Sequence, residues 1–219
     1  MKKGFFVFCC LFFSLFIAAT KAAPDIQPEI VDFLKPKLNS DRIEYFFGSY
    51  GIDTLDIDSP VFPNSRITNL YSIHNEKKIM RTLAIVDFTQ PIHPDLSDAH
   101  REIAEGKSIG IALRKHGWVI HKTPVYFGTI PLSAGLMDWM KESRVDQAAL
   151  HIYLLEVSKD GKPYYIPYCT IMEVHSPQYL TIEWLQALYD DQYEKFSIAT
   201  EEVTSLLYRL SILIHDLYL

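Results

Sequence analysis

The chain has 219 residues and a formal net charge of −6 at pH 7, with 21 Lys and Arg against 27 Asp and Glu. This acidic balance argues against a nucleic-acid-binding protein and against an electrostatic hold on anionic lipid. Of the three cysteines, only Cys169 lies beyond residue 22, so we expect no intramolecular disulfide in the rest of the chain.

The first 22 residues have the pattern of a secretory signal peptide. Lys2 and Lys3 form a positive start, residues 4–19 are almost wholly apolar, and Ala22 ends a cleavage site of small residues before Ala23. This apolar run is shorter than the roughly 20 residues that a membrane span needs. The sequence therefore predicts a cleaved signal peptide over 1–22, a single domain over 23–219, a periplasmic or secreted location, and no stable membrane insertion after cleavage.

Prolines punctuate the start of the predicted domain and allow only a short helix near residues 28–34. Residues 42–58 are rich in aromatic and β-branched side chains, with apolar and acidic residues alternating in the second half. This pattern predicts one strand, entered through a bend between Gly48 and Gly51.

A β-hairpin is predicted next, because the runs 66–74 and 78–88 have strand character and flank a short polar segment. Residues 95–105 then have helical spacing, with Gly106 as the C-terminal cap. Ser108 is expected to cap a second short helix that runs to Lys115.

Strand character returns at 118–130 and continues in a second predicted hairpin, formed by 149–158 and 162–174. Asp160-Gly161 joins these two runs, and this dipeptide suits a type I′ turn. Proline cannot donate a hydrogen bond to a strand ladder, so Pro163 and Pro167 predict that the second run is an edge strand.

The C-terminal part reads as helix, with an i, i+3, i+4, i+7 apolar stripe from Val203 to Leu217. Arg209, His215 and Asp216 interrupt it, so we expect this helix to cover a sheet face rather than to cross a membrane. The whole pattern predicts an α+β fold: a mostly antiparallel sheet of five or six strands with helices in the middle and at the C-terminus.

Residues 106–110, GKSIG, match the G-x-S-x-G pattern of the nucleophile elbow in α/β-hydrolases. That elbow needs a strand before the serine and a helix after it, whereas the residues before Ser108 read as helix. We therefore favour a capping role for Ser108 and keep a serine hydrolase with Ser108 as its nucleophile as the alternative.

The histidines His93 and His100 form, with Asp95, the densest cluster of possible metal ligands. Their spacing does not place two imidazoles on one helical face, and no H-E-x-x-H or paired-cysteine motif occurs. A metal-binding protein that uses His93 and His100 is the second alternative, and we expect neither a metal nor another cofactor.

Aromatic side chains gather on the predicted edge strand, at Tyr164, Tyr165 and Tyr168. They form a possible interaction surface, because an edge strand with exposed rings can accept a partner strand or stack on a ligand. Cys169 on the same run has no basic neighbour that would lower its pKa, so it is expected to be inert.

The phrases FGSYG (47–51), NLYSIH (69–74), RTLAIVDF (81–88) and GKSIG (106–110) resemble a group of exported bacterial proteins without an assigned function. The resemblance covers residues 41–130. It implies an exported, single-domain protein and transfers no catalytic residue. Together these observations predict a non-enzymatic protein that binds an envelope protein or a small ligand.

Overall fold

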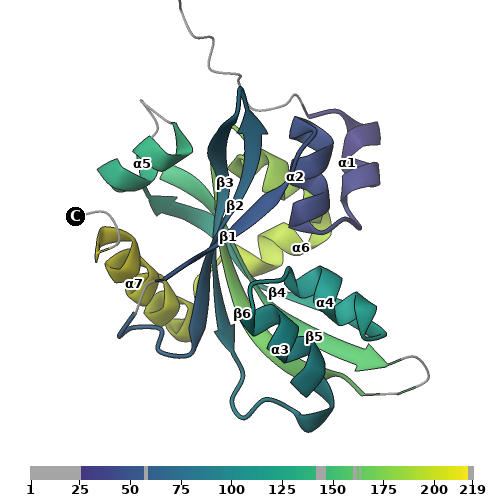
Figure 1. The fold of residues 1–219 in the computed structure, drawn as a ribbon. Helices are drawn as coiled ribbons and strands as arrows, with labels where there is room; N and C mark the ends of the chain where they lie inside the picture. Colours follow the sequence, from purple (N-terminus) through teal and green to yellow (C-terminus); the bar gives the residue numbers. More distant parts are fainter. Residues whose placement is uncertain (1–25, 57–58, 142–146, 160–161, 163, 217–219) are drawn as a thin grey trace, which may run out of the picture.

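The computed structural model describes residues 26–56, 59–141, 147–159, 162 and 164–216, and the predicted signal peptide and its cleavage site lie outside this part. The described chain forms one antiparallel sheet with the strand order β1-β2-β3-β6-β5-β4 and helices on both faces (Figure 1). The predicted α+β class with a mostly antiparallel sheet is therefore confirmed.

Two successive units with the order α-α-β-β-β build the sheet, although the sequence shows no internal repeat. The first unit is α1 (Pro28–Leu34), α2 (Asn39–Phe47), β1 (Gly51–Leu55), β2 (Ser65–His74) and β3 (Lys77–Phe88). The second is α3 (Ser97–Ala104), α4 (Ile109–Lys115), β4 (Trp118–Pro131), β5 (Gln147–Lys159) and β6 (Ile166–His175). Exchanging the two units leaves the strand order unchanged, so an approximate twofold axis passes between β3 and β6.

Four further elements lie outside this repeat. A 3-10 turn, η1 (Pro94–Leu96), precedes α3, and α5 (Ala134–Met140) is inserted between β4 and β5. The C-terminal helices are α6 (Ile182–Phe196) and α7 (Glu201–Asp216), both in the region predicted as helical. In the described part of the chain, no helix is long and apolar enough to cross a membrane.

The prediction of a single strand over 42–58 is wrong in its first half, which belongs to helix α2. The Asp41 side chain accepts a hydrogen bond from the backbone N–H of Leu38 at the start of this helix, and Gly48 ends it with a φ of 72°. The first feature is typical of a helix N-terminus and the second of a helix C-terminus. Ile43 is fully buried beneath it, so burial at helical spacing outweighs the strand preference of the aromatic residues.

The prediction that the second strand of the C-terminal hairpin lies at an edge is also wrong, because β6 pairs with both β3 and β5. Pro167 is tolerated there for two reasons. Its pairing with β3 begins only at Cys169, and on the β5 side Pro167 lies opposite Glu156, where the register shifts. A missing N–H at a bulge breaks no regular ladder bond.

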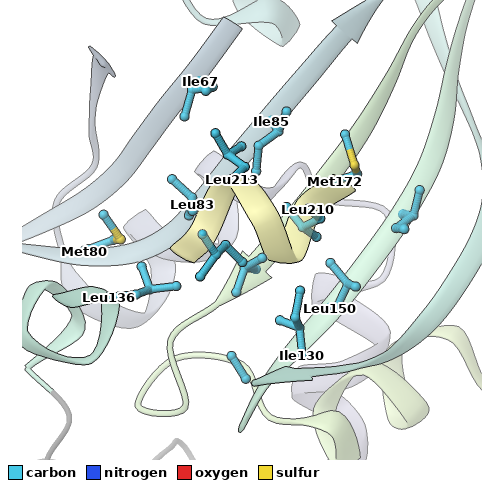
Figure 2. Close-up of a cluster of buried hydrophobic side chains, with 14 of the residues drawn as sticks. Ile67, Met80, Leu83, Ile85, Ile130, Leu136, Leu150, Met172, Leu210 and Leu213 are labelled. Atoms are coloured by element: carbon cyan, nitrogen blue, oxygen red, sulfur yellow. The ribbon is translucent and has the colours of Figure 1, made fainter. Parts of the chain in front are cut away.

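One face of the sheet is covered by α5 and α7 over a continuous apolar cluster. Leu210 and Leu213 of α7 lie among side chains from β2, β3, β5 and β6 (Figure 2). Both leucines are almost fully buried, so the predicted stripe does cover the sheet.

The opposite face is covered by two separate groups of helices. Helices α3 and α4 pack over one apolar cluster, and α1, α2 and α6 pack over another (Figure 1). Between these groups the sheet carries buried polar side chains, and this boundary contains the site described next.

Candidate functional site

The cavity floor is formed by two rows of residues that lie side by side across the sheet. Thr68, Ala84 and Glu173 form one row over β2, β3 and β6. The next row on the same face runs from Arg66 through Val86 and Ile171 to Tyr153. Because Ala84 and Thr68 are small, the space above the first row is left unfilled.

Two helix starts cover this floor. Leu38 and Asn39 come from the start of α2, and Ser108 to Gly110 come from the start of α4. A side chain at Gly110 would collide with Leu38, so the absence of a Cβ allows the two segments to meet. The cavity between them has a volume of about 80 Å³. Most of its wall is apolar, with side chains that include Ile52, Leu70, Val86, Ile120, Leu155 and Ile171.

Arg66 enters this cavity from β2 and also anchors the segment between α3 and α4. Its Nη1 donates to the carbonyl oxygens of Ile103 (3.1 Å) and Lys107 (2.7 Å), and its Nη2 donates to that of Gly106 (3.0 Å). Its Nε donates to Thr54. A guanidinium at the C-terminus of α3 also complements the helix dipole. Burial lowers the pKa of Arg66, but an arginine remains charged in proteins.

Glu173 lines the cavity from β6 and is only 6% exposed. Its Oε1 accepts hydrogen bonds from Asn39 Nδ2 and from the Tyr153 hydroxyl, both at 3.2 Å. No salt bridge joins Glu173 to Arg66 among the described residues, and two strand spacings of about 4.8 Å separate the strands that carry them. The cavity lining therefore includes a cation and a carboxylate that come from different rows of the sheet.

Two buried histidines lie beside Glu173. His175 Nδ1 is 3.1 Å from the Thr82 hydroxyl, and His175 Nε2 is 3.8 Å from Glu173 Oε2. Although that distance would suit an ion pair, burial lowers the pKa of His175 to about 3, with a further contribution from Arg42 and Lys122. His151 stacks on Phe127, and burial also lowers its pKa well below the usual value. Both imidazoles are therefore neutral near pH 7.

Ser108 lies at the N-cap position of α4, as predicted, but its side chain makes no capping hydrogen bond. Its hydroxyl instead interacts with Tyr50, and both residues line the cavity near Arg66. Burial raises the pKa of Tyr50, so this phenol stays protonated.

The GKSIG segment connects helix α3 to helix α4, so it lacks the strand-to-helix turn of a nucleophile elbow. No hydrogen bond joins Ser108 to a histidine in the part of the chain that the structure describes. Gly106 has a φ of 100° just after α3, as expected for a helix C-cap glycine. A serine nucleophile at Ser108 stays a prediction, which labelling with a fluorophosphonate would test.

The two histidines proposed as metal ligands have other contacts. His93 Nδ1 accepts a hydrogen bond from the backbone N–H of Asp95, and His100 Nδ1 lies 2.9 Å from the Tyr168 hydroxyl. Among the described residues, no group of three or more His, Cys, Asp or Glu side chains has a metal-binding arrangement.

The three tyrosines of the predicted interaction surface are divided between surface and core. Tyr164 and Tyr165 are 51% and 55% exposed and precede β6. Tyr168 is 1% exposed, because β6 lies inside the sheet and carries it into the core beneath α3. Cys169 is also buried, and burial raises the pKa of its thiol, which agrees with an inert cysteine.

Sequence reasoning did not identify Arg66, Glu173 or Tyr153 as site residues. A signal was present, since Arg66 and Glu173 are charged residues within strand segments rich in β-branched and apolar residues, RITNLY and TIMEVH. Charged side chains are seldom fully buried unless they are paired or functional. No protein-family model matches this sequence, and no curated protein matches it.

Proposed function

We propose that the protein binds a small organic anion with an apolar body in the cavity between α2 and α4. The main support is a mostly apolar cavity whose lining includes the buried residues Arg66 and Glu173. A concave apolar site with a few converging polar groups is the usual form of a small-molecule site.

The charges of the lining favour a ligand with an acidic group. Arg66 and Lys122 contribute two positive charges and Glu173 one negative charge. An anionic group would approach Arg66, Tyr50 and Ser108, while a hydroxyl or amine of the ligand would donate to Glu173. A volume near 80 Å³ is about half of the roughly 150 Å³ cavity that accepts benzene, so the ligand is compact or its entry displaces side chains.

Calorimetric titration with monocarboxylates of increasing size tests this proposal. We expect affinity to rise from acetate through butyrate to benzoate until the cavity is filled, and to fall when the matching amides replace the acids. Ala84→Leu adds bulk at the cavity floor and should abolish binding. Ile85→Val on the opposite face of the same strand is the matched control and should bind as the wild type does. Equal binding to Ala84→Leu, or no preference for acids over amides, would contradict the proposal.

We also propose that the protein is exported to the periplasm or secreted, on the basis of the charged start and apolar run in residues 2–22. Intact-mass measurement of envelope and medium fractions should find a chain that begins at Ala23. Recovery of only the full-length chain in membranes would replace export with anchoring.

A further inference from the structure

The buried carboxylate of Glu173 has no cationic partner in the part of the chain that the structure describes. Its Oε1 accepts two hydrogen bonds, both from the neutral donors Asn39 and Tyr153. Its Oε2 lies 3.8 Å from Nε2 of His175, whose lowered pKa keeps that imidazole neutral near pH 7. A carboxylate that is removed from water is usually paired with an opposite charge. Glu173 therefore has hydrogen-bond donors but lacks that charge.

The cationic side chains of α2 and of the cavity lining interact with other groups. Arg42 donates to two backbone carbonyl oxygens and to the Tyr189 hydroxyl. Lys122 Nζ lies over the Tyr153 ring, 4.7 Å from its centre. Among the described residues, neither of these two cations nor Arg66 forms a salt bridge with Glu173.

Arg66 is in the converse position. It is 7% exposed, and its guanidinium donates to three backbone carbonyl oxygens and to the Thr54 hydroxyl, all of which are neutral acceptors. Arg66 lines the cavity from β2 and Glu173 lines it from β6. The lining thus contains a buried charge of each sign, and within the described chain neither charge has an ion-pair partner.

We infer that the ligand of this cavity is a compact amino acid whose amino and carboxyl groups lie at opposite ends of an apolar chain. The inference rests on the proposed function, because it adds an ammonium group to the acid proposed for the same cavity. An ammonium group both donates a hydrogen bond to Glu173 and supplies the charge that Asn39 and Tyr153 lack, whereas a hydroxyl supplies only the hydrogen bond. A metal ion is a poorer partner, because in the described ranges no group of three or more His, Cys, Asp or Glu side chains has a metal-binding arrangement.

The positions of the two charges favour a ligand with separated ends. Glu173 and Arg66 belong to different rows of the cavity floor, and strand β3 lies between the strands that carry them. Val86 and Ile171 contribute apolar surface to the same lining. An α-amino acid carries both charged groups on one carbon atom and cannot place them at two such positions. An ω-amino acid places one group at each end and lays its methylene chain against the apolar wall.

Calorimetric titration with matched ligands tests the two ends separately. For chains of four, five and six carbon atoms, the ω-amino acid, the plain acid and the amide of each are compared, as in 5-aminovalerate, valerate, 5-aminovaleramide and valeramide. For at least one length, we expect the ω-amino acid to bind tenfold or more tightly than the plain acid, because an ion pair shielded from water is strong. Norvaline is an isomer of 5-aminovalerate with both charged groups on one carbon atom. Norvaline should bind at least tenfold more weakly than the best ω-amino acid.

The variant Glu173→Gln removes the carboxylate charge and keeps an oxygen that can accept from Asn39 and Tyr153. We expect it to reduce the preference for the ω-amino acid over the plain acid from tenfold or more to less than twofold. The control is Glu44→Gln, which removes an exposed carboxylate of α2 outside the cavity lining and should keep the preference. An equal loss of preference in both variants would overturn the inference. If circular dichroism shows that Glu173→Gln does not fold, the ligand comparison with the wild type decides alone.

A failure of the inference can be distinguished from a failure of the proposed function. If acids bind more tightly than amides but the amino group adds nothing at any chain length, the inference is overturned and the acid site stands. Norvaline binding as tight as that of the best ω-amino acid would also overturn the inference and leave the acid site in place. If amines bind and acids have no advantage over amides, the ligand is a simple amine, and both the inference and the proposed function fail.

Discussion

The two faces of the sheet differ in the kind of side chain that they bury. Beneath α5 and α7 the buried cluster consists of hydrophobic side chains, and strands β2 to β6 contribute to it together with these two helices (Figure 2). On the other face the covering helices form two groups, and buried polar residues gather where the groups meet. They include Asn39, Arg42, Arg66, Thr68, Thr82, His151, Glu173 and His175.

This difference separates a face that stabilises the fold from the face that carries the proposed binding site. A continuous apolar face gains free energy from every side chain that it removes from water. A face that buries charged and polar groups loses some of that gain, since each such group needs a partner. The cavity lies on the second face, between the two groups of helices.

The largest effect is expected from the apolar face. Deletion of residues 203–219 removes α7 and exposes the cluster beneath it, so the truncated protein should show no cooperative unfolding transition in circular dichroism. Leu210→Ala should lower the free energy of unfolding by about 2 to 5 kcal/mol, because it leaves a cavity in a packed core. Ser211→Ala, on the exposed side of the same helix, is the control and should change it by less than about 0.5 kcal/mol. A truncated protein with an unchanged transition would show that α7 is not needed for the fold.

A smaller loss is expected at Arg66 on the polar face. Arg66→Met leaves the carbonyl oxygens of Ile103, Gly106 and Lys107 without this donor, which should lower the free energy of unfolding by about 2 to 4 kcal/mol. Amide exchange between residues 103 and 110 should become faster. Arg66→Lys keeps the charge but cannot reach all three carbonyls, so its effect should be intermediate. Unchanged exchange in Arg66→Met would show that the segment is held by other contacts.

The buried histidines predict a dependence of stability on pH. The pKa values of His151 and His175 are lowered in the folded protein, to about 3 for His175. The unfolded chain therefore takes up protons below about pH 6.5 that the folded chain does not. Their contribution to stability is intact above that pH and is lost as the pH falls towards 3, by about 1.4 kcal/mol per pH unit for each histidine.

The matched comparison for this pH dependence uses one buried and one exposed histidine. Urea unfolding between pH 6.5 and 4.5 should show a shallower slope for His151→Phe, which keeps the stack on Phe127 but does not titrate. His74→Gln, at an exposed position, should keep the wild-type slope. If both variants keep the wild-type slope, the folded protein accepts a proton at His151 without unfolding.

The smallest effect is expected at Ser108, where the sequence predicted a capping side chain. Because its hydroxyl makes no capping bond and interacts only with Tyr50, Ser108→Ala should lower the free energy of unfolding by about 0.5 kcal/mol, the low end for a single hydrogen bond. Thr181 accepts a hydrogen bond from the Trp184 backbone N–H at the start of α6, so Thr181→Ala should lower it by about 1 kcal/mol. Thermal unfolding of the two variants and the wild type measures both losses. A loss in Ser108→Ala as large as that in Thr181→Ala, with Tyr50→Phe as stable as the wild type, would restore the capping role of Ser108.

The residue patterns of the sequence predicted most of the fold. The strands of the two hairpins, the helices on either side of Gly106 and the amphipathic α7 all lie within a few residues of their predicted ranges. Two features could not be predicted in this way. Helix α2 depends on burial against α6, and the interior position of β6 depends on a register shift opposite Pro167, so both are set by contacts distant in sequence.

The site was predicted less well than the fold. Ser108 and Gly110 do line the cavity, but the sequence pointed to them through a hydrolase pattern rather than through this geometry. Arg66 and Glu173 are more than a hundred residues apart, and only the pairing of β2, β3 and β6 brings them to one cavity. A cavity of this kind is a property of the assembled sheet, so no short motif marks it.

The pairing of β3 with β6 has a consequence for the order in which the molecule assembles. The hairpins β2-β3 and β5-β6 join residues close in sequence, whereas Thr82 and His175, paired across the centre, are 93 residues apart. Closing so long a loop is slow, so we expect the hairpins to form early and their docking to limit the folding rate. The cavity takes its lining from both sides of that junction and exists only after docking. A bound ligand should therefore slow unfolding while leaving the folding rate unchanged, because the transition state offers it no complete site.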